Sequence, residues 1–212
     1  MISWDLTVLK LINLEWTHPL LDWLMPAVSA AGAWLPLLLL LVGIVVWRGR
    51  WRAVWMCFCI AATVGVSDGL VSRNIKFLTE RVRPRNSVEG LIVRDLAIAK
   101  PEFMRLFHPP VKLASKNQAK TRGGSFPSSH TMNMFALATV MTLFSRRWSL
   151  FFYALAALVA YSRLYCAAHW PTDIVPSMGM GILIGWVVPR ILFRAAHRFG
   201  FAHRVLGPWR EV

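Results

Sequence analysis

Apolar stretches of about twenty residues, the length at which a helix can cross a bilayer, recur along this chain and constrain its fold more than any other feature. The 212 residues contain five of them: 23–47, most strongly apolar from Trp34 onward, then 53–72, 127–145, 148–166 and 171–189. Backbone groups within lipid must be hydrogen-bonded inside their own segment, so each stretch is expected to be helical. The sequence therefore predicts an all-α fold, a polytopic membrane helix bundle with five transmembrane helices.

The charge balance supports this reading and excludes other classes. Hydrophobic residues make up 56% of the chain and charged residues 16%, whereas a soluble domain carries about 25% charged residues. A disordered chain is excluded, because so much apolar surface cannot remain in water. The net charge of +14 would favour a nucleic-acid partner in a less apolar chain. Here we expect the bilayer as partner and no nucleic acid.

Segments outside the five stretches complete a single integral-membrane domain over residues 1–212. Residues 6–25 predict either an amphipathic helix in the membrane interface or part of a sixth span. Residues 85–126 form a long loop, and loops of this length are uncommon unless they work as lids or binding elements. A short amphipathic helix is predicted over residues 91–104. Residues 190–212 form a basic tail.

Arginine clusters predict the orientation of the bundle, since loops rich in Lys and Arg stay in the cytoplasm. Such clusters follow the first, third and fifth stretches: Arg48, Arg50 and Arg52; Arg146 and Arg147; Arg190, Arg194, Arg198, Arg204 and Arg210. Because successive spans alternate in direction, the three clusters share one side. We therefore expect a cytoplasmic tail and an outward-facing loop. Basic residues of that loop, Lys112, Lys116 and Lys120 among them, are expected to capture an anionic headgroup.

Polar residues interrupt the apolar pattern in three clusters. These are Lys76 with Arg83; Ser128, Ser129 and His130; and Arg163, His169 and Asp173. The first ends the second stretch, the second begins the third stretch, and the last lies at the junction of the fourth and fifth. Alternating spans therefore bring all three clusters to the outward face.

The residue types in these clusters suit the binding and attack of a phosphate. Arg offers a planar fork to phosphate oxygens and Lys a point charge. Ser128 and Ser129 precede a predicted helix, whose free N–H groups favour an anion. His169 and Asp173 are four residues apart, and a carboxylate so placed can fix the tautomer of an imidazole and raise its nucleophilicity. No paired acidic ligands or Zn-type spacing accompany them, so no cofactor or metal is expected.

Each residue taken alone also has an ordinary structural explanation. Lys76 and Arg83 could extend from helix ends to the interface, Ser128 could cap a helix, and Asp173 could favour a helix dipole. Arg163 is different, because an ionisable residue within a span is functional by default. The joint spacing, in order and on one side, favours a common site.

The three clusters resemble the motifs of the type 2 phosphatidic acid phosphatase (PAP2) superfamily, which also includes vanadium haloperoxidases and bacterial acid phosphatases. The matching motifs are Lys76-x6-Arg83-Pro84, Pro127-Ser128-Ser129-His130 and Ser162-Arg163-x5-His169-x3-Asp173. With the helices between them they cover about residues 68–190. One departure is Ser129, which replaces the usual glycine and changes how closely the backbone can approach an oxyanion.

The resemblance implies a role for each matching residue. His169 would attack phosphorus and form a phosphohistidine, Asp173 would orient it, and His130 would protonate the leaving oxygen and then activate water. The nonbridging oxygens would be held by Lys76, Arg83, Ser128, Ser129 and Arg163. The resemblance also implies that the reaction is independent of metal.

We therefore expect a lipid phosphatase in the bacterial inner membrane, with its site facing the periplasm or exterior. Its substrate would be a phosphomonoester or pyrophosphate on a lipid headgroup, with undecaprenyl diphosphate first and lipid A 1-phosphate or phosphatidylglycerophosphate as alternatives. A non-enzymatic lipid-phosphate binding or transport protein is a further alternative. A transporter would want charges near the bilayer midplane, and a binding protein would not need both His169 and Asp173.

Overall fold

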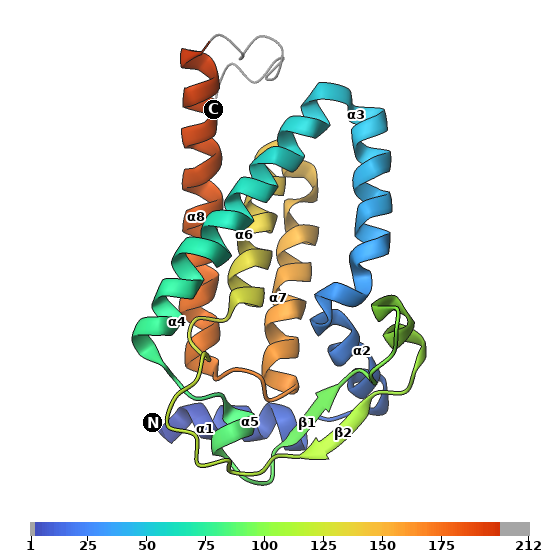
Figure 1. Cartoon of the computed structure of the whole chain (residues 1–212), viewed down its shortest axis with the longest axis vertical. Coiled ribbons are helices and arrows are strands. Elements are labelled where there is room, and N and C mark those ends of the chain that lie inside the picture. Colours follow the sequence, from blue (N-terminus) through green and yellow to red (C-terminus); the bar gives the residue numbers. More distant parts are fainter. Residues whose placement is uncertain (1–2, 200–212) are drawn as a thin grey trace.

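The computed structural model describes residues 3–199, so the distal tail, residues 200–212, lies outside the described part (Figure 1). Its elements in chain order are α1 (Ser3–Lys10), η1 (Leu11–Glu15), α2 (Pro19–Ser29), η2 (Ala31–Trp34), α3 (Leu35–Val64), η3 (Gly65–Ser72), α4 (Arg73–Thr79), α5 (Pro84–Ser87), β1 (Ile92–Asp95), η4 (Glu102–Phe107), β2 (Val111–Ala114), α6 (Ser129–Phe144), η5 (Arg146–Trp148), α7 (Ser149–Tyr165) and α8 (Pro171–Arg198). The described chain is therefore mostly helical, as predicted.

Helices cover all five predicted spans. The first two form one continuous helical path, in which α3 reverses direction at Arg50 (φ 50°, ψ −138°) and continues through η3 into α4. The other three are α6, α7 and α8, which run side by side (Figure 1). Among the described residues, Ala31–Ser87 and Pro171–Arg198 are the two helical segments long and apolar enough to cross a membrane. This confirms a mostly helical fold with two candidate membrane-spanning segments, while the count of five crossings stays a prediction.

The N-terminal segment lies across one end of the bundle (Figure 1). It is broken into α1 and η1, of 8 and 5 residues, and the separate α2 of 11 residues. At about 1.5 Å per residue, α1 and η1 together are roughly 20 Å long, less than the about 30 Å of a bilayer core. This arrangement favours the interfacial alternative over a sixth span.

The long loop contains a small sheet, which corrects two predictions. Strands β1 and β2 pair antiparallel with Ile92 opposite Ala114, and the 3-10 helix η4 lies between them. The predicted amphipathic helix over residues 91–104 is therefore wrong, and so is an all-α description of this region. The physical reason is that β-branched residues at both strands favour an extended pairing, while Pro101 lacks the amide that a helix interior needs.

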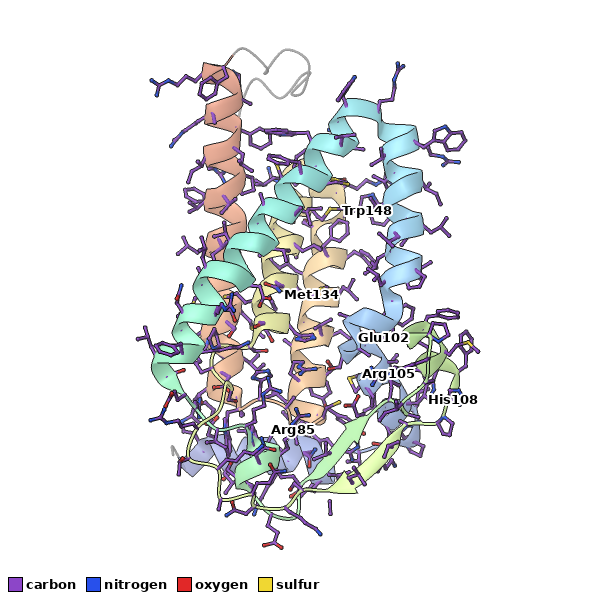
Figure 2. The ribbon with its side chains drawn as sticks, in the orientation of Figure 1. Arg85, Glu102, Arg105, His108, Met134 and Trp148 are labelled. Carbon is purple, nitrogen blue, oxygen red and sulfur yellow. The ribbon has the colours of Figure 1, made fainter. Side chains whose placement is uncertain are left out.

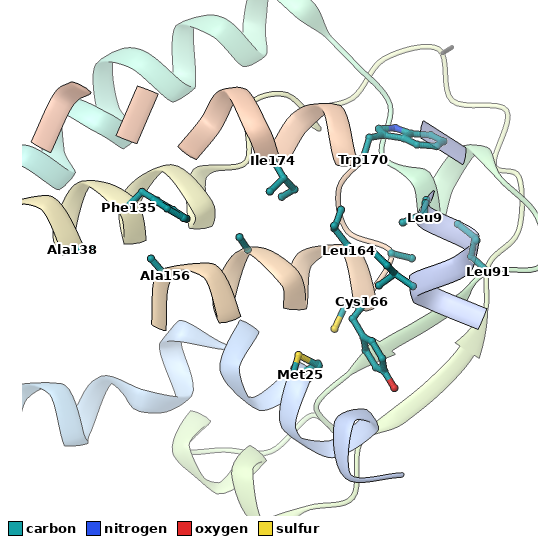
Figure 3. Close-up of a cluster of buried hydrophobic side chains, with 14 residues drawn as sticks. Leu9, Met25, Leu91, Phe135, Ala138, Ala156, Leu164, Cys166, Trp170 and Ile174 are labelled. Carbon is teal, nitrogen blue, oxygen red and sulfur yellow. The ribbon is translucent and has the colours of Figure 1, made fainter. Parts of the chain in front are cut away.

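The buried core lies between α6, α7 and α8 and extends to α1 and α2 (Figure 3). Its apolar side chains include Phe135 of α6, Ala156 and Leu164 of α7, and Ile174 of α8. Leu9 of α1 is fully buried in the same cluster, so the crosswise helix is packed onto the bundle rather than loosely attached. The core thereby fixes α1 against the turn between α7 and α8.

Candidate active site

The three predicted clusters meet at the end of the bundle that α1 covers. Lys76 of α4 donates a hydrogen bond to the Ser129 hydroxyl at the start of α6, which joins the first cluster to the second. His130 lies within electrostatic range of Arg163 and His169, which places the second cluster beside the third. The structure thus brings together residues that lie nearly a hundred positions apart in the sequence.

His169 lies in the turn between α7 and α8 and is 2% exposed. Its Nδ1 lies 3.6 Å from Oδ2 of Asp173 and has no hydrogen-bond partner among the described residues. This separation exceeds a hydrogen bond, and catalytic contacts of this kind often tighten only when substrate is bound. Burial lowers the pKa of His169 to about 4, so the imidazole is neutral at pH 7. A neutral imidazole facing a carboxylate has the form that a nucleophile needs.

Asp173 is fully buried and held by three further donors. Its carboxylate accepts hydrogen bonds from Nη1 of Arg81 at 2.6 Å, from Oγ of Ser125 at 2.5 Å and from the amide of Trp170 at 2.9 Å. Arg81 and Ser125 were missed by the sequence analysis. Their only signal was proximity to the motifs, because Arg81 lies between Lys76 and Arg83 and Ser125 just before Pro127.

The second cluster lies at the N-terminus of α6. Met132 makes the first intrahelical bond, to the Ser128 carbonyl, so the amides before it have no acceptor within the helix and can face an anion. The Ser128 amide is the exception, since it donates to Oγ of Ser177. Ser129 does more than replace a glycine: its hydroxyl accepts from Lys76 and lies 2.6 Å from the Ser72 hydroxyl. The Ser129 hydroxyl therefore holds the Lys76 ammonium at the N-terminus of α6.

Lys76, Arg83 and Arg163 are the site cations. None of them makes an ion pair within 4.0 Å among residues 3–199, whereas the nearby Arg81 and Arg122 do. The Arg163 guanidinium donates to the Ser29 hydroxyl, and its buried Nε has no hydrogen-bond partner in the described chain. Burial, followed by repulsion from Arg85, lowers the pKa of Arg83. Cations gathered without counter-ions form a site for a multiply charged anion.

Arg85 is an additional basic residue at this end of the bundle. Its amide donates to the Ala167 carbonyl, two residues before His169, at 3.2 Å. Figure 2 shows its side chain at the end of α7, above α1. The described residues contain no group of three or more His, Cys, Asp and Glu side chains that could hold a metal ion. The side chains gathered here are cations, histidines and one buried carboxylate, a set that suits the binding of a phosphate.

Comparison with known proteins agrees with this geometry. The family model of the PAP2 superfamily matches residues 52–196. A lipid A 4'-phosphatase of Bacteroides thetaiotaomicron is 29% identical over 174 residues, which cover 80% of this chain and 68% of that protein. An undecaprenyl-diphosphatase of Sulfolobus acidocaldarius is 25% identical over 194 residues, which cover 90% of this chain and 79% of that protein.

A solved structure has the same fold. The crystal structure of Aquifex aeolicus LpxE matches with a TM-score of 0.60 at 22% identity, over 89% of this chain and 96% of that one. At this identity the likeness concerns the fold, and the motif residues carry the argument about chemistry.

Proposed function

The chain belongs to the PAP2 superfamily and is a phosphatase, and we propose that it removes phosphate from a membrane lipid through a phosphohistidine at His169. The observation that carries this proposal is the buried, neutral His169 beside Asp173, next to three cations without counter-ions. A nucleophile, an orienting carboxylate and a positively charged pocket are the parts that phosphoryl transfer to a side chain requires.

The geometry divides the work among these residues. Nδ1 of His169 faces Asp173, so Nε2 is left to form the bond to phosphorus as the bond to the lipid oxygen breaks. The carboxylate stabilises the positive charge that develops on the ring. His130 gives its proton to the departing oxygen and then takes one from the water that releases phosphate. The site cations and the α6 N-terminus hold the nonbridging oxygens, where negative charge gathers.

The surroundings of the site support a lipid substrate. The first arm of α3 exposes the apolar run Leu37–Leu41, a surface that suits lipid rather than water. The site lies at the end of the bundle that α1 crosses (Figure 1), and we place the lipid headgroups at this end. A lipid phosphate can enter there while its chain remains among the apolar helix faces.

Undecaprenyl diphosphate is the first candidate, and a lipid A phosphate is the second. Arg85 lies near enough to Arg83 to lower its pKa by repulsion, so a further positive charge lies next to the site. This additional charge suits a diphosphate better than a single phosphate. The second candidate rests on the resemblance to lipid A 4'-phosphatases, whereas the sequence had suggested the 1-phosphate. Phosphatidylglycerophosphate ranks third.

The proposed location is the bacterial inner membrane, crossed five times, with the site on the periplasmic or outer face. The bend at Arg50, the helix η5 with Arg146 and Arg147, and the C-terminal end of α8 all lie at the end of the bundle opposite α1 (Figure 1). Arginine-rich ends are retained in the cytoplasm. The opposite end, which carries the site, then faces outward.

Phosphate release by the purified protein tests this proposal. Undecaprenyl diphosphate, lipid A and phosphatidylglycerophosphate are presented in the same detergent micelles, with His169→Ala as the inactive control. We expect release from at least one lipid, fastest from undecaprenyl diphosphate, and none above background from the variant. Absence of release from all three by folded wild-type protein would refute the proposed function.

A further inference from the structure

A buried network joins the N-terminal helix to Asp173. Asp5 of α1 is fully buried and accepts a hydrogen bond from Nη2 of Arg81 at 2.7 Å. Nη1 of the same guanidinium donates to Oδ1 of Asp173 at 2.6 Å. One arginine thus bridges two buried carboxylates, one near the N-terminus and one at the start of α8.

Thr172 forms hydrogen bonds with both Asp5 and Arg81. Its amide and hydroxyl donate to the Asp5 carboxylate at 3.0 Å and 2.7 Å, and its hydroxyl accepts from Nη1 of Arg81 at 2.8 Å. Arg81 also lies over the Trp170 ring, 5.6 Å from the centroid. Both rotation and displacement of the guanidinium are therefore restricted.

The bridge determines which oxygen of Asp173 faces His169. Arg81 binds Oδ1, while Oδ2 accepts from Ser125 and the Trp170 amide and lies 3.6 Å from Nδ1 of the imidazole. Asp5 in turn holds Arg81 in place. Without Asp5, the Asp173 carboxylate would be the only ionic partner of this guanidinium among the described residues, and its orientation would be less restricted.

We propose that Asp5, acting through Arg81, is a positioning residue for the His169–Asp173 pair, so that α1 is part of the catalytic machinery rather than only an interfacial anchor. This inference rests on the proposed phosphohistidine chemistry. It does not depend on which lipid is the substrate.

The attachment of α1 to the bundle does not depend on Asp5, which allows the two roles to be separated. Leu9 is buried in the core, and Nδ2 of Asn13 donates to the Tyr165 carbonyl at 2.7 Å. Asp5→Asn removes the charge but keeps a carbonyl oxygen for the Thr172 amide. The variant is therefore expected to fold with α1 in place.

The test compares Asp5→Asn with Glu15→Gln, a matched charge-to-amide change at an exposed position of the same N-terminal segment. The substrate is p-nitrophenyl phosphate in detergent micelles, which reports on the nucleophile without requiring the correct lipid. Misplacement by about 1 Å can reduce a rate about 100-fold, so we expect kcat of Asp5→Asn to fall about 10- to 100-fold with KM nearly unchanged. Glu15→Gln should match the wild type.

Two further variants separate positioning from simple stabilisation. Asp5→Glu restores the carboxylate and should recover part of kcat, and Thr172→Val removes only one hydroxyl and should lower kcat less than Asp5→Asn does. Thermal unfolding is measured in parallel. Wild-type kcat in folded Asp5→Asn, or a loss that disappears when activity is scaled to the folded fraction, would overturn the proposal. Wild-type protein inactive on every phosphate ester would instead refute the proposed function.

Discussion

The close approach of α6 and α8 makes Gly181 a sensitive probe of the site. A Cβ added at Gly181 would lie 2.4 Å from the Met132 carbonyl oxygen and 3.0 Å from Cβ of Phe135. Ordinary contacts begin at 3.4 Å, so Gly181→Ala requires the two helices to separate locally by about 1 Å, the difference between 3.4 and 2.4. Both neighbours are backbone or Cβ atoms, which cannot simply rotate away.

The separation should affect stability and catalysis together. Overpacking of a well-packed interface costs about 1–3 kcal/mol. Met132 is two residues from His130 on α6, and Gly181 shares α8 with Asp173. A displacement of about 1 Å between His130, the proposed acid, and Asp173, the proposed partner of His169, can reduce turnover up to about 100-fold. We expect a lower unfolding temperature and a kcat reduced about 10- to 100-fold.

Gly179→Ala is the matched control, because it lies on the same helix and its added Cβ meets nothing within 4 Å. Both variants are purified in one detergent, and thermal unfolding and phosphate release are measured side by side. Gly179→Ala should behave as wild type. If Gly181→Ala has the same unfolding temperature and kcat as Gly179→Ala, the close α6–α8 contact does not position the site.

Three other predictions follow from the site and its loop. Burial lowers the pKa of His169 to about 4, against about 6.5 in an unfolded chain, so kcat should fall on the acidic side near pH 4. The stability that the neutral ring provides should be full above pH 6.5 and lost as pH falls toward 4, and a pH series of activity and thermal unfolding measures both effects. EDTA should leave turnover unchanged while orthovanadate inhibits it as a transition-state mimic, and strict dependence on added Mg²⁺ would contradict this. Neutralising Lys116 and Lys120 together should raise the apparent KM for the lipid and weaken the salt dependence of KM without changing kcat. A variant whose KM equals that of the wild type at both low and high salt would reject a role of these lysines in headgroup capture.

Lys112 is left out of that last variant because the structure gives it another role. It forms an ion pair with Asp22 of α2, which also accepts from Nε of Arg94 at 2.5 Å. Arg94 is buried and lies over the Tyr165 ring. Lys112, which was predicted to capture substrate, and Arg94 of the same loop therefore hold the β1–β2 hairpin against the bundle. A count of charges along a loop cannot distinguish these partners from free cations.

The sequence pattern was sufficient to predict those elements that depend on the hydrophobicity of one continuous segment. Apolar length predicted the helices that carry the site, and the spacing of Lys76, Ser128 and His169 predicted that their clusters would meet, because alternating helices return to the same end. Charged and hydroxyl residues in these positions needed only the correct helix ends to come together in the proposed phosphate site.

The network behind the site could not be predicted in this way. Asp5 and Arg81 are 76 positions apart, and Arg81 and Asp173 are 92 apart, so no helical or strand periodicity relates them. In sequence, Arg81 resembles any charged residue at a helix end. Its role depends on the crosswise packing of α1, which follows from tertiary contacts such as that of Leu9.

Detection of the phosphorylated enzyme is the strictest test of the phosphohistidine mechanism. Protein is mixed with radiolabelled lipid phosphate in a single turnover, quenched in alkali, where phosphohistidine survives, and mapped by peptide mass spectrometry. We expect transient label on His169, none in His169→Ala, and label that persists longer in His130→Ala, because His130 activates the water. Product formation with no labelled enzyme at any time, or label on a different residue, would contradict this mechanism.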